Sequence, residues 1–195
     1  MYYDTLYLMS ELKNYASPKS KLTSLVKAGE FTRIRRGLYI KDGNYNLKTL
    51  ANVIYCPSYI SFEYALSFYG MIPERAELIT SAVFNKNKDR KFDTPAGSFI
   101  YKYVKPELYF YGIDRLMENG EPFLIATKEK ALCDVLYKIK SFKRNSDIED
   151  VLFGNLRLDE EEFLKLKITD MKILAPLYKR IIIDKMYEYL KKRRK

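Results

Sequence analysis

The chain has 195 residues, a formal net charge of +10 and no histidine. The absence of histidine excludes Ser-His-Asp and Cys-His nucleophiles, His-bearing zinc sites and imidazole acid-base catalysis. Cys56 and Cys133 are the only cysteines, too few for a four-cysteine metal site. We therefore expect no catalytic centre, no metal and no cofactor. Two thiols favour a reducing cytoplasm, and we find neither a secretion signal nor an apolar run of about 18 residues that could cross a membrane.

The positive charge is concentrated at the two ends of the chain. Residues 1–41 carry eight Lys and Arg against three Asp and Glu, and residues 42–140 carry thirteen against twelve. Residues 141–195 carry fourteen against ten, with five basic residues at positions 191–195. This distribution favours a polyanionic partner, and the alternative is a charge excess that serves solubility.

The first two predicted elements are helices. Asp4 can cap a helix whose one face carries Leu8, Met9, Leu12 and Tyr15. Ser17-Pro18 is typical of a helix start, and Gly29 is typical of the residue that follows a helix. We therefore predict a second helix over residues 18–28, with Leu22, Leu25 and Val26 buried and with polar side chains on another face. Those polar side chains are Lys19, Ser20, Thr23 and Lys27.

A β-hairpin is predicted over residues 31–40. Gly37 marks its turn, and Ile34, Leu38 and Ile40 are expected to face the core. The tip of this hairpin gathers Arg33, Arg35 and Arg36. Residues 41–46 contain Asp-Gly and two Asn, which is typical of a linker. We therefore predict two domains, 1–45 and 46–195.

The second domain is predicted to mix helices with an antiparallel sheet and to end in helices. We expect helices over residues 47–55, 61–69 and 127–139, and strands over residues 58–60, 78–84, 90–93 and 98–104. Asn119-Gly120 predicts a tight hairpin between strands at 108–117 and 121–126. Helices follow at 147–153, 159–166 and 170–192, the last interrupted or bent at Pro176. The predicted fold class is α+β, with a small winged-helix-like module first.

A helix presenting Lys, Ser and Thr, followed at once by an Arg-tipped hairpin, is the layout of a winged helix. A helix fits the major groove of DNA, and arginines are attracted to the backbone and to narrow minor grooves. The expected DNA-binding residues are Lys19, Ser20, Thr23, Lys27, Arg33, Arg35 and Arg36. The alternative is a basic amphipathic helix packed on a solvated hairpin.

Four ordered stretches resemble the AbiEi family of antitoxins. The first, residues 18–39, is similar to the family's wing signature, with Gly29, Arg33 and Arg36-Gly37 in order. Residues 57–74, 94–101 and 125–134 are similar to the family's second domain. One departure is that only two helices precede the wing, where a standard winged helix has three.

The resemblance implies a transcriptional regulator of a type IV toxin–antitoxin system used in abortive infection, a defence against phage. Members repress their own operon by binding operator repeats. They counter a nucleotidyltransferase-like toxin, apparently without a stable complex. The resemblance points to Ser58, Tyr59, Ser61 and Glu63 as candidates for the antitoxic function, although N-capping explains Ser61 equally well. Two alternatives stay open: a carboxylate-dependent nuclease, and an orphan DNA-binding regulator without a toxin.

Overall fold

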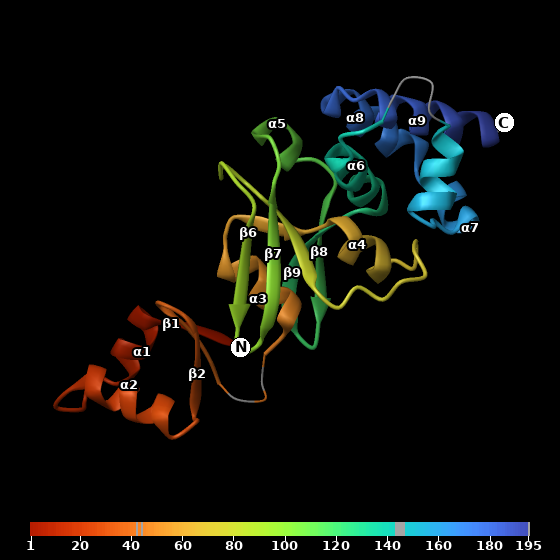
Figure 1. The fold of residues 1–195 in the computed structure, drawn as a ribbon. Helices are drawn as coiled ribbons and strands as arrows, with labels where there is room; N and C mark the ends of the chain where they lie inside the picture. The colour runs from red at the N-terminus through yellow and green to blue at the C-terminus, as the bar shows by residue number, and fades with distance from the viewer. Residues whose placement is uncertain (42, 44, 143–146, 195) are drawn as a thin grey trace.

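The structure is a computed structural model that describes residues 1–41, 43, 45–142 and 147–194. It is an α+β fold with one three-stranded and one six-stranded sheet in the described residues. Figure 1 shows the N-terminal elements at one end of the molecule, the larger sheet in the middle and the C-terminal helices at the opposite end.

The N-terminal module begins with a strand that the sequence did not predict. Its elements are β1 (Tyr2–Asp4), α1 (Thr5–Glu11), α2 (Pro18–Lys27), β2 (Phe31–Arg35) and β3 (Leu38–Lys41). The sheet order is β1-β3-β2 and all pairs are antiparallel. The caps predicted at Asp4 and Gly29 are confirmed, because the Asp4 side chain accepts a hydrogen bond from the Tyr7 N–H at 2.7 Å and Gly29 has φ +78°. Ser17 precedes α2 as predicted, but its hydroxyl makes no capping hydrogen bond. The strand β1 was missed because it forms only by pairing with β3, far along the chain.

The two faces of this small sheet have different neighbours. Ile34, Leu38 and Ile40 are buried, as predicted, and they belong to the same continuous apolar core as the larger sheet. Leu8 of α1 and Leu22 of α2 are also buried, but they lie outside that core. The hairpin β2–β3 is therefore packed onto the rest of the protein. The predicted linker includes residues 42 and 44, which lie outside the described residues.

The larger sheet has the strand order β6-β7-β5-β4-β9-β8. Its strands are β4 (Ser58–Ile60), β5 (Ile79–Val83), β6 (Arg90–Thr94), β7 (Gly97–Tyr103), β8 (Ile113–Glu118) and β9 (Glu121–Ala126). The prediction of an antiparallel sheet was wrong, because β5 pairs with β7 and β4 pairs with β9 in parallel. Tight turns fix the pairing within the hairpins β6–β7 and β8–β9 only. Every residue of the central strands β4 and β5 is buried. The position of each hairpin in the sheet therefore depends on burying these strands, which its turn does not determine.

Helices cover both faces of the larger sheet. The helices that precede the C-terminal group are α3 (Leu47–Ile54), α4 (Phe62–Phe68), α5 (Pro106–Tyr109) and α6 (Lys128–Lys138). On one face the Tyr101 hydroxyl donates to the Ala51 carbonyl of α3, and on the other Tyr59 reaches α6. The strand predicted from residue 108 was wrong at its start, because Pro106 begins the short helix α5 and β8 starts only at Ile113.

The C-terminal part is helical, as predicted. It comprises a short π-helix η1 (Asp150–Asn155), α7 (Glu160–Leu164), α8 (Ile168–Tyr178) and α9 (Ile181–Arg193). The break expected at Pro176 lies three residues later, since Pro176 is inside α8 and the chain leaves the helix at Lys179 with φ +50°. Cys56 and Cys133 are both free thiols. No helix among the described residues has the length and apolar character needed to cross a membrane.

Candidate functional site

The N-terminal module forms a groove between α2 and the hairpin. The groove has a volume of about 480 Å³ and is lined by Lys19, Thr23 and Lys27 of α2 and by Arg33 and Tyr39 of the hairpin. Lys19, Thr23 and Lys27 follow one another at helical spacing, so they share a face of α2. The structure thus brings together four of the seven predicted DNA-binding residues. Three of the four are cationic, and none of the Asp and Glu residues that the structure describes lines the groove.

Hydrogen bonds within α2 restrict what its hydroxyl groups can offer a ligand. The Thr23 hydroxyl donates to the Lys19 carbonyl at 3.0 Å. Its proton is therefore used inside the helix, and its oxygen lone pairs remain as acceptors. The Ser20 hydroxyl lies 2.9 Å from the Ser17 hydroxyl, so Ser20 already has a partner at the start of the helix.

The three arginines of the hairpin do not lie together. The register of β2 against β3 shifts between Arg33 and Arg35, and all three arginines are exposed. Arg33 lines the groove with α2, whereas Arg35 lies on the side of the larger sheet. Burial raises the pKa of Tyr101, and the positive charge of Arg35 acts on the same hydroxyl in the opposite direction. Arg36 and Gly37 make the turn, which is held to α1 by the Thr5 N–H donating to the Gly37 carbonyl at 3.2 Å.

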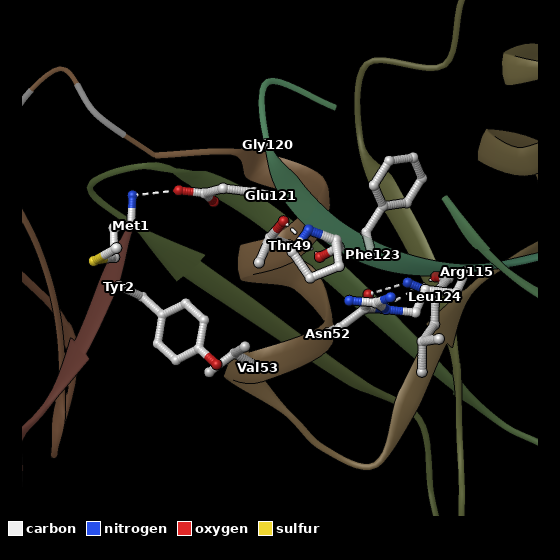
Figure 2. A pocket seen from close by; sticks show the side chains of 11 residues that line it. Met1, Tyr2, Thr49, Asn52, Val53, Arg115, Gly120, Glu121, Phe123 and Leu124 are labelled. Atoms are coloured by element: carbon white, nitrogen blue, oxygen red, sulfur yellow. Dashed lines mark hydrogen bonds and ion pairs between the residues drawn. The ribbon is translucent and has the colours of Figure 1, made fainter. Parts of the chain in front are cut away.

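A second hollow lies where the N-terminal module meets the larger region. Figure 2 shows Met1 and Tyr2 of the first strand facing α3 and the β8–β9 hairpin across this space. The Met1 ammonium group is 2.5 Å from the Glu121 carboxylate. On the opposite wall the Asn52 side chain accepts a hydrogen bond from the Leu124 N–H at 2.7 Å. The first strand is thus in ionic contact with the larger sheet.

A polar cluster without exposed surface lies in the core beneath α6. Lys130 and Asp134 of α6 are both 0% exposed and 3.2 Å apart. One carboxylate oxygen of Asp134 accepts hydrogen bonds from Tyr59 at 3.0 Å and from Ser61 at 2.7 Å. The other accepts from Tyr178 of α8 at 2.6 Å. The cluster therefore connects β4, α6 and α8.

Lys130 completes its hydrogen bonds within the same cluster. It donates to the Tyr178 hydroxyl at 2.6 Å and to the Leu108 carbonyl of α5. Gly112 allows this arrangement, because a Cβ atom at that position would lie 2.9 Å from Cβ of Lys130. Burial, followed by the charge of Asp134, raises the pKa of Tyr59 and of Tyr178 well above the usual tyrosine range. Both hydroxyls therefore stay protonated and act as donors to Asp134.

The four residues considered for the antitoxic function do not form one surface. Tyr59 and Ser61 are fully buried in the polar cluster. Ser61 precedes α4, but its side chain makes no capping hydrogen bond and serves Asp134 instead. Ser58 is buried on the other face of β4, where it donates to the Asn52 carbonyl at 3.5 Å. Only Glu63 is exposed, in a salt bridge with Lys102 at 2.9 Å.

Sequence reasoning missed the members of the cluster that lie outside β4. The sequence alone did not single out Lys130, Asp134 or Tyr178. Glu129 lies in the first turn of α6, is 4% exposed and accepts the Lys167 N–H at 2.7 Å. The one available signal was Lys130 and Asp134 four residues apart in a helix rich in Ala, Leu and Val. Among the described residues no group of three or more Cys, Asp or Glu side chains could hold a metal ion.

The basic residues at the C-terminus are mostly engaged within the chain. Lys191 pairs with Glu188 at 2.5 Å, and Arg193 pairs with Glu160 at 3.3 Å. Arg194 donates to the Leu166 carbonyl at 2.6 Å. Position 195 lies outside the described residues. These residues belong to the end of α9, and their charges are mostly paired within the chain. The groove of the N-terminal module therefore has more unpaired positive charge than the end of α9.

The comparisons with known proteins add no assignment. No protein-family model matches the chain. No curated protein matches it either.

Proposed function

We propose that the N-terminal module binds duplex DNA and that the protein is a cytoplasmic antitoxin and autorepressor of the AbiEi type. In this proposal it represses a type IV toxin–antitoxin operon of abortive infection by binding operator repeats. It counters a nucleotidyltransferase-like toxin without a stable complex. The observation that supports DNA binding best is the groove that Lys19, Lys27 and Arg33 line together, with no carboxylate of the described part of the chain in its lining.

The order of the elements supports a minimal winged helix. Helices α1 and α2 are followed directly by the hairpin β2–β3, and β1 adds a third strand to that hairpin. The second helix of such a pair is the one that enters the major groove in helix-turn-helix proteins. Residues 17–41 carry seven basic side chains against the single acid Glu30. A phosphate backbone would therefore be attracted to the face formed by α2 and the hairpin.

The hydrogen bonds of α2 specify what each side chain would do on DNA. Lys19 and Lys27 are suited to phosphates on either side of the groove, because each is an exposed cation at an end of the same helical face. Thr23 can only accept, since its proton is donated to Lys19. In the major groove it would therefore read a donor, the N6 amino group of adenine or the N4 amino group of cytosine. Arg33, which lines the same groove, and Arg36, at the turn of the hairpin, would contact the backbone.

A salt titration of DNA affinity tests this proposal. Changing Arg33 and Arg36 to Ala removes two cations from the hairpin, one of them from the groove. If both contact phosphates, affinity for operator and scrambled duplexes falls alike, and the log–log salt slope flattens by about 1–2. The matched control changes Lys191 and Lys192 to Ala and leaves the slope unchanged. An unchanged slope in the Arg variant, with intact circular dichroism, would remove the hairpin from the interface.

Base reading by α2 has a separate signature. Changing Thr23 to Val keeps the shape of the side chain and removes its acceptor. We expect the variant to lose about 1–3 kcal/mol of binding free energy at operator DNA while its affinity for scrambled DNA stays the same. The same loss on both duplexes would assign Thr23 to helix stability rather than to base recognition.

The proposal also assigns no catalytic activity to this chain. Purified protein incubated with Mg²⁺ or Mn²⁺ should leave DNA and RNA intact. Metal-dependent cleavage that is abolished by mutating one of the protein's own carboxylates would favour a nuclease instead. Expression beside the neighbouring gene separates an antitoxin from an orphan regulator, because only an antitoxin rescues cells from a toxic neighbour.

A further inference from the structure

The hollow between β1, α3 and the β8–β9 hairpin has the size of a small-molecule site. Its volume is about 470 Å³, within the range of roughly 300–1,000 Å³ typical of ligand pockets. The walls are mostly apolar and include Tyr2 of β1, Val53 of α3, and Pro122 and Leu124 of β9. Figure 2 shows Tyr2, Val53 and Leu124 among the side chains that line this hollow.

Apolar surface at this hollow remains in contact with water. Met1 is 59% exposed, Tyr2 42% and Leu124 38%, and all three line the same hollow. Single exposed apolar residues are normal on a protein surface, whereas several around one concavity indicate a binding site. A ligand here would gain free energy by covering them.

Several polar groups of the hollow are engaged within the protein. Thr49 donates to the Pro122 carbonyl at 2.9 Å, and the Asn52 side chain bonds to the main chain of Leu124. The Glu121 carboxylate is 2.5 Å from the Met1 ammonium group. Two lining side chains have no hydrogen-bond or ion-pair partner in the described part of the chain: the Tyr2 hydroxyl and Arg115, which is the only charged one of the two.

Arg115 lies beside the apolar side chains of the hollow. Arg115 of β8 is directly opposite Leu124 of β9, so the two side chains project from the same face of the hairpin. A guanidinium group stays charged at every physiological pH and can hold a carboxylate through two parallel hydrogen bonds. An apolar hollow with one unpaired cation at its edge is complementary to an apolar acid.

We propose that this hollow binds a small organic anion with an apolar body and one carboxylate, held by Arg115. The ligand would touch β1 on one side and α3 and β9 on the other. Since β1 pairs with β3 of the hairpin, the ligand would bridge the N-terminal module and the larger region. The expected effect of the ligand on DNA affinity rests on the proposed function, whereas the binding of the ligand to the hollow does not.

Binding is tested with octanoate on the full chain labelled with ¹³C at the methionine methyl groups. Octanoate should shift the Met1 signal and leave Met71 and Met186 unmoved, because both of these are buried in the core. Changing Arg115 to Gln should weaken octanoate about tenfold or more, from the loss of a charge-assisted contact. The matched control changes the exposed Arg75 to Gln and keeps the wild-type affinity. Octanol, which lacks the carboxylate, should bind the Arg115→Gln variant and the wild type equally.

Three results would overturn the proposal. Equal octanoate affinity in the Arg115→Gln variant would remove the cation from the site. Shifts of Met71 and Met186 together with Met1 would indicate detergent-like unfolding. A Met1 signal that shifts with protein concentration and not with octanoate would show that a second copy of the chain, and not a small anion, occupies the hollow.

The effect of octanoate on DNA binding is measured in a separate experiment. Octanoate should change the affinity for operator DNA, and operator DNA should change the affinity for octanoate by the same factor. Octanoate binding with unaltered DNA affinity would remove the coupling between the two sites. Absence of any DNA binding would refute the proposed function and leave the octanoate site standing.

Discussion

Lys130 and Asp134 form a buried ion pair in the core of the larger region. Both are 0% exposed, and each is surrounded by hydrogen-bond partners from other elements. Removing one member of a buried pair leaves the other charge uncompensated, which costs about 3–5 kcal/mol. Removing both members together leaves no buried charge.

We therefore expect Asp134→Leu to destabilise the protein by about 3–5 kcal/mol and the double variant Lys130→Met, Asp134→Leu to be more stable than Asp134→Leu alone. Urea unfolding measures both. The control is Glu74→Gln, which breaks the exposed pair with Arg157 at 2.5 Å and should change stability by less than about 1 kcal/mol. A double variant less stable than Asp134→Leu would show that the other hydrogen-bond partners of Lys130 stabilise its buried charge without Asp134.

Glu162 provides a pH-dependent contribution on the surface. Hydrogen bonds from Lys128 and Lys165 lower the pKa of its carboxyl group to about 2. Because the folded pKa lies below the usual value of 4.5, ionised Glu162 stabilises the fold at neutral pH. That contribution is lost as the pH falls from about 4.5 towards 2.

Comparison with Glu162→Gln isolates this contribution. We expect the wild type to be the more stable protein at pH 6 and the two proteins to converge near pH 2. Thermal unfolding followed across this pH range measures the difference. A difference that stays constant with pH would mean that the two lysines do not interact with the ionised carboxylate in solution.

At the scale of elements, the junction of α8 and α9 stores backbone strain. Lys179 has φ +50°, a conformation that glycine adopts at little cost and other residues adopt less readily. We expect Lys179→Gly to stabilise the protein by about 0.5–1 kcal/mol. The control, Lys172→Gly in the exposed middle of α8, should destabilise it by about 1 kcal/mol. Equal destabilisation by both changes in urea unfolding would show that the junction is not strained.

Elements whose signals are local were predicted well. Asp4, Thr127 and Asp159 each accept a main-chain N–H at the start of a helix, as their sequence context indicates. Asn119 and Gly120 both have positive φ at the turn of the β8–β9 hairpin. Such signals depend on a few neighbouring residues, and the physics that creates them is contained in those residues.

Features that depend on distant partners were not predictable in this way. The strand β1 exists because Tyr2 pairs with Ile40. The parallel pairing of β4 and β9 depends on Ile60 meeting Ile125. Lys130 and Asp134 at a spacing of four residues are also typical of a solvated helix face. Only the packing of β4 and α8 against α6 makes them interior, and no window of the sequence contains all three elements.

At the scale of the whole molecule, the larger region contains its own sheet, helices and buried polar cluster. A fragment of residues 46–195 should therefore unfold cooperatively. We expect it to be less stable than the full chain, because Ile34, Leu38 and Ile40 no longer cover its apolar core. Calorimetry of the fragment and the full chain measures the difference.

The same fragment also tests the proposed division of labour. It should still protect cells from the toxin and should fail to bind operator DNA. The full chain carrying Arg33→Ala and Arg36→Ala is the matched control, since it keeps the apolar contact and loses only the charges. Full repression by the fragment would place the operator contacts in the larger region.

The packing of the hairpin onto the larger region has a consequence for synthesis on the ribosome. The N-terminal module is complete once its pairing of Tyr2 with Ile40 has formed. By contrast, the hydrogen bond between Tyr59 and Asp134 can form only after 75 further residues have been synthesised. At translation rates of about 5–20 residues per second, that delay is on the order of 4–15 s. During this interval the nascent chain displays a finished small module whose Ile34, Leu38 and Ile40 are still uncovered, and chaperones that bind aliphatic surface have a target there.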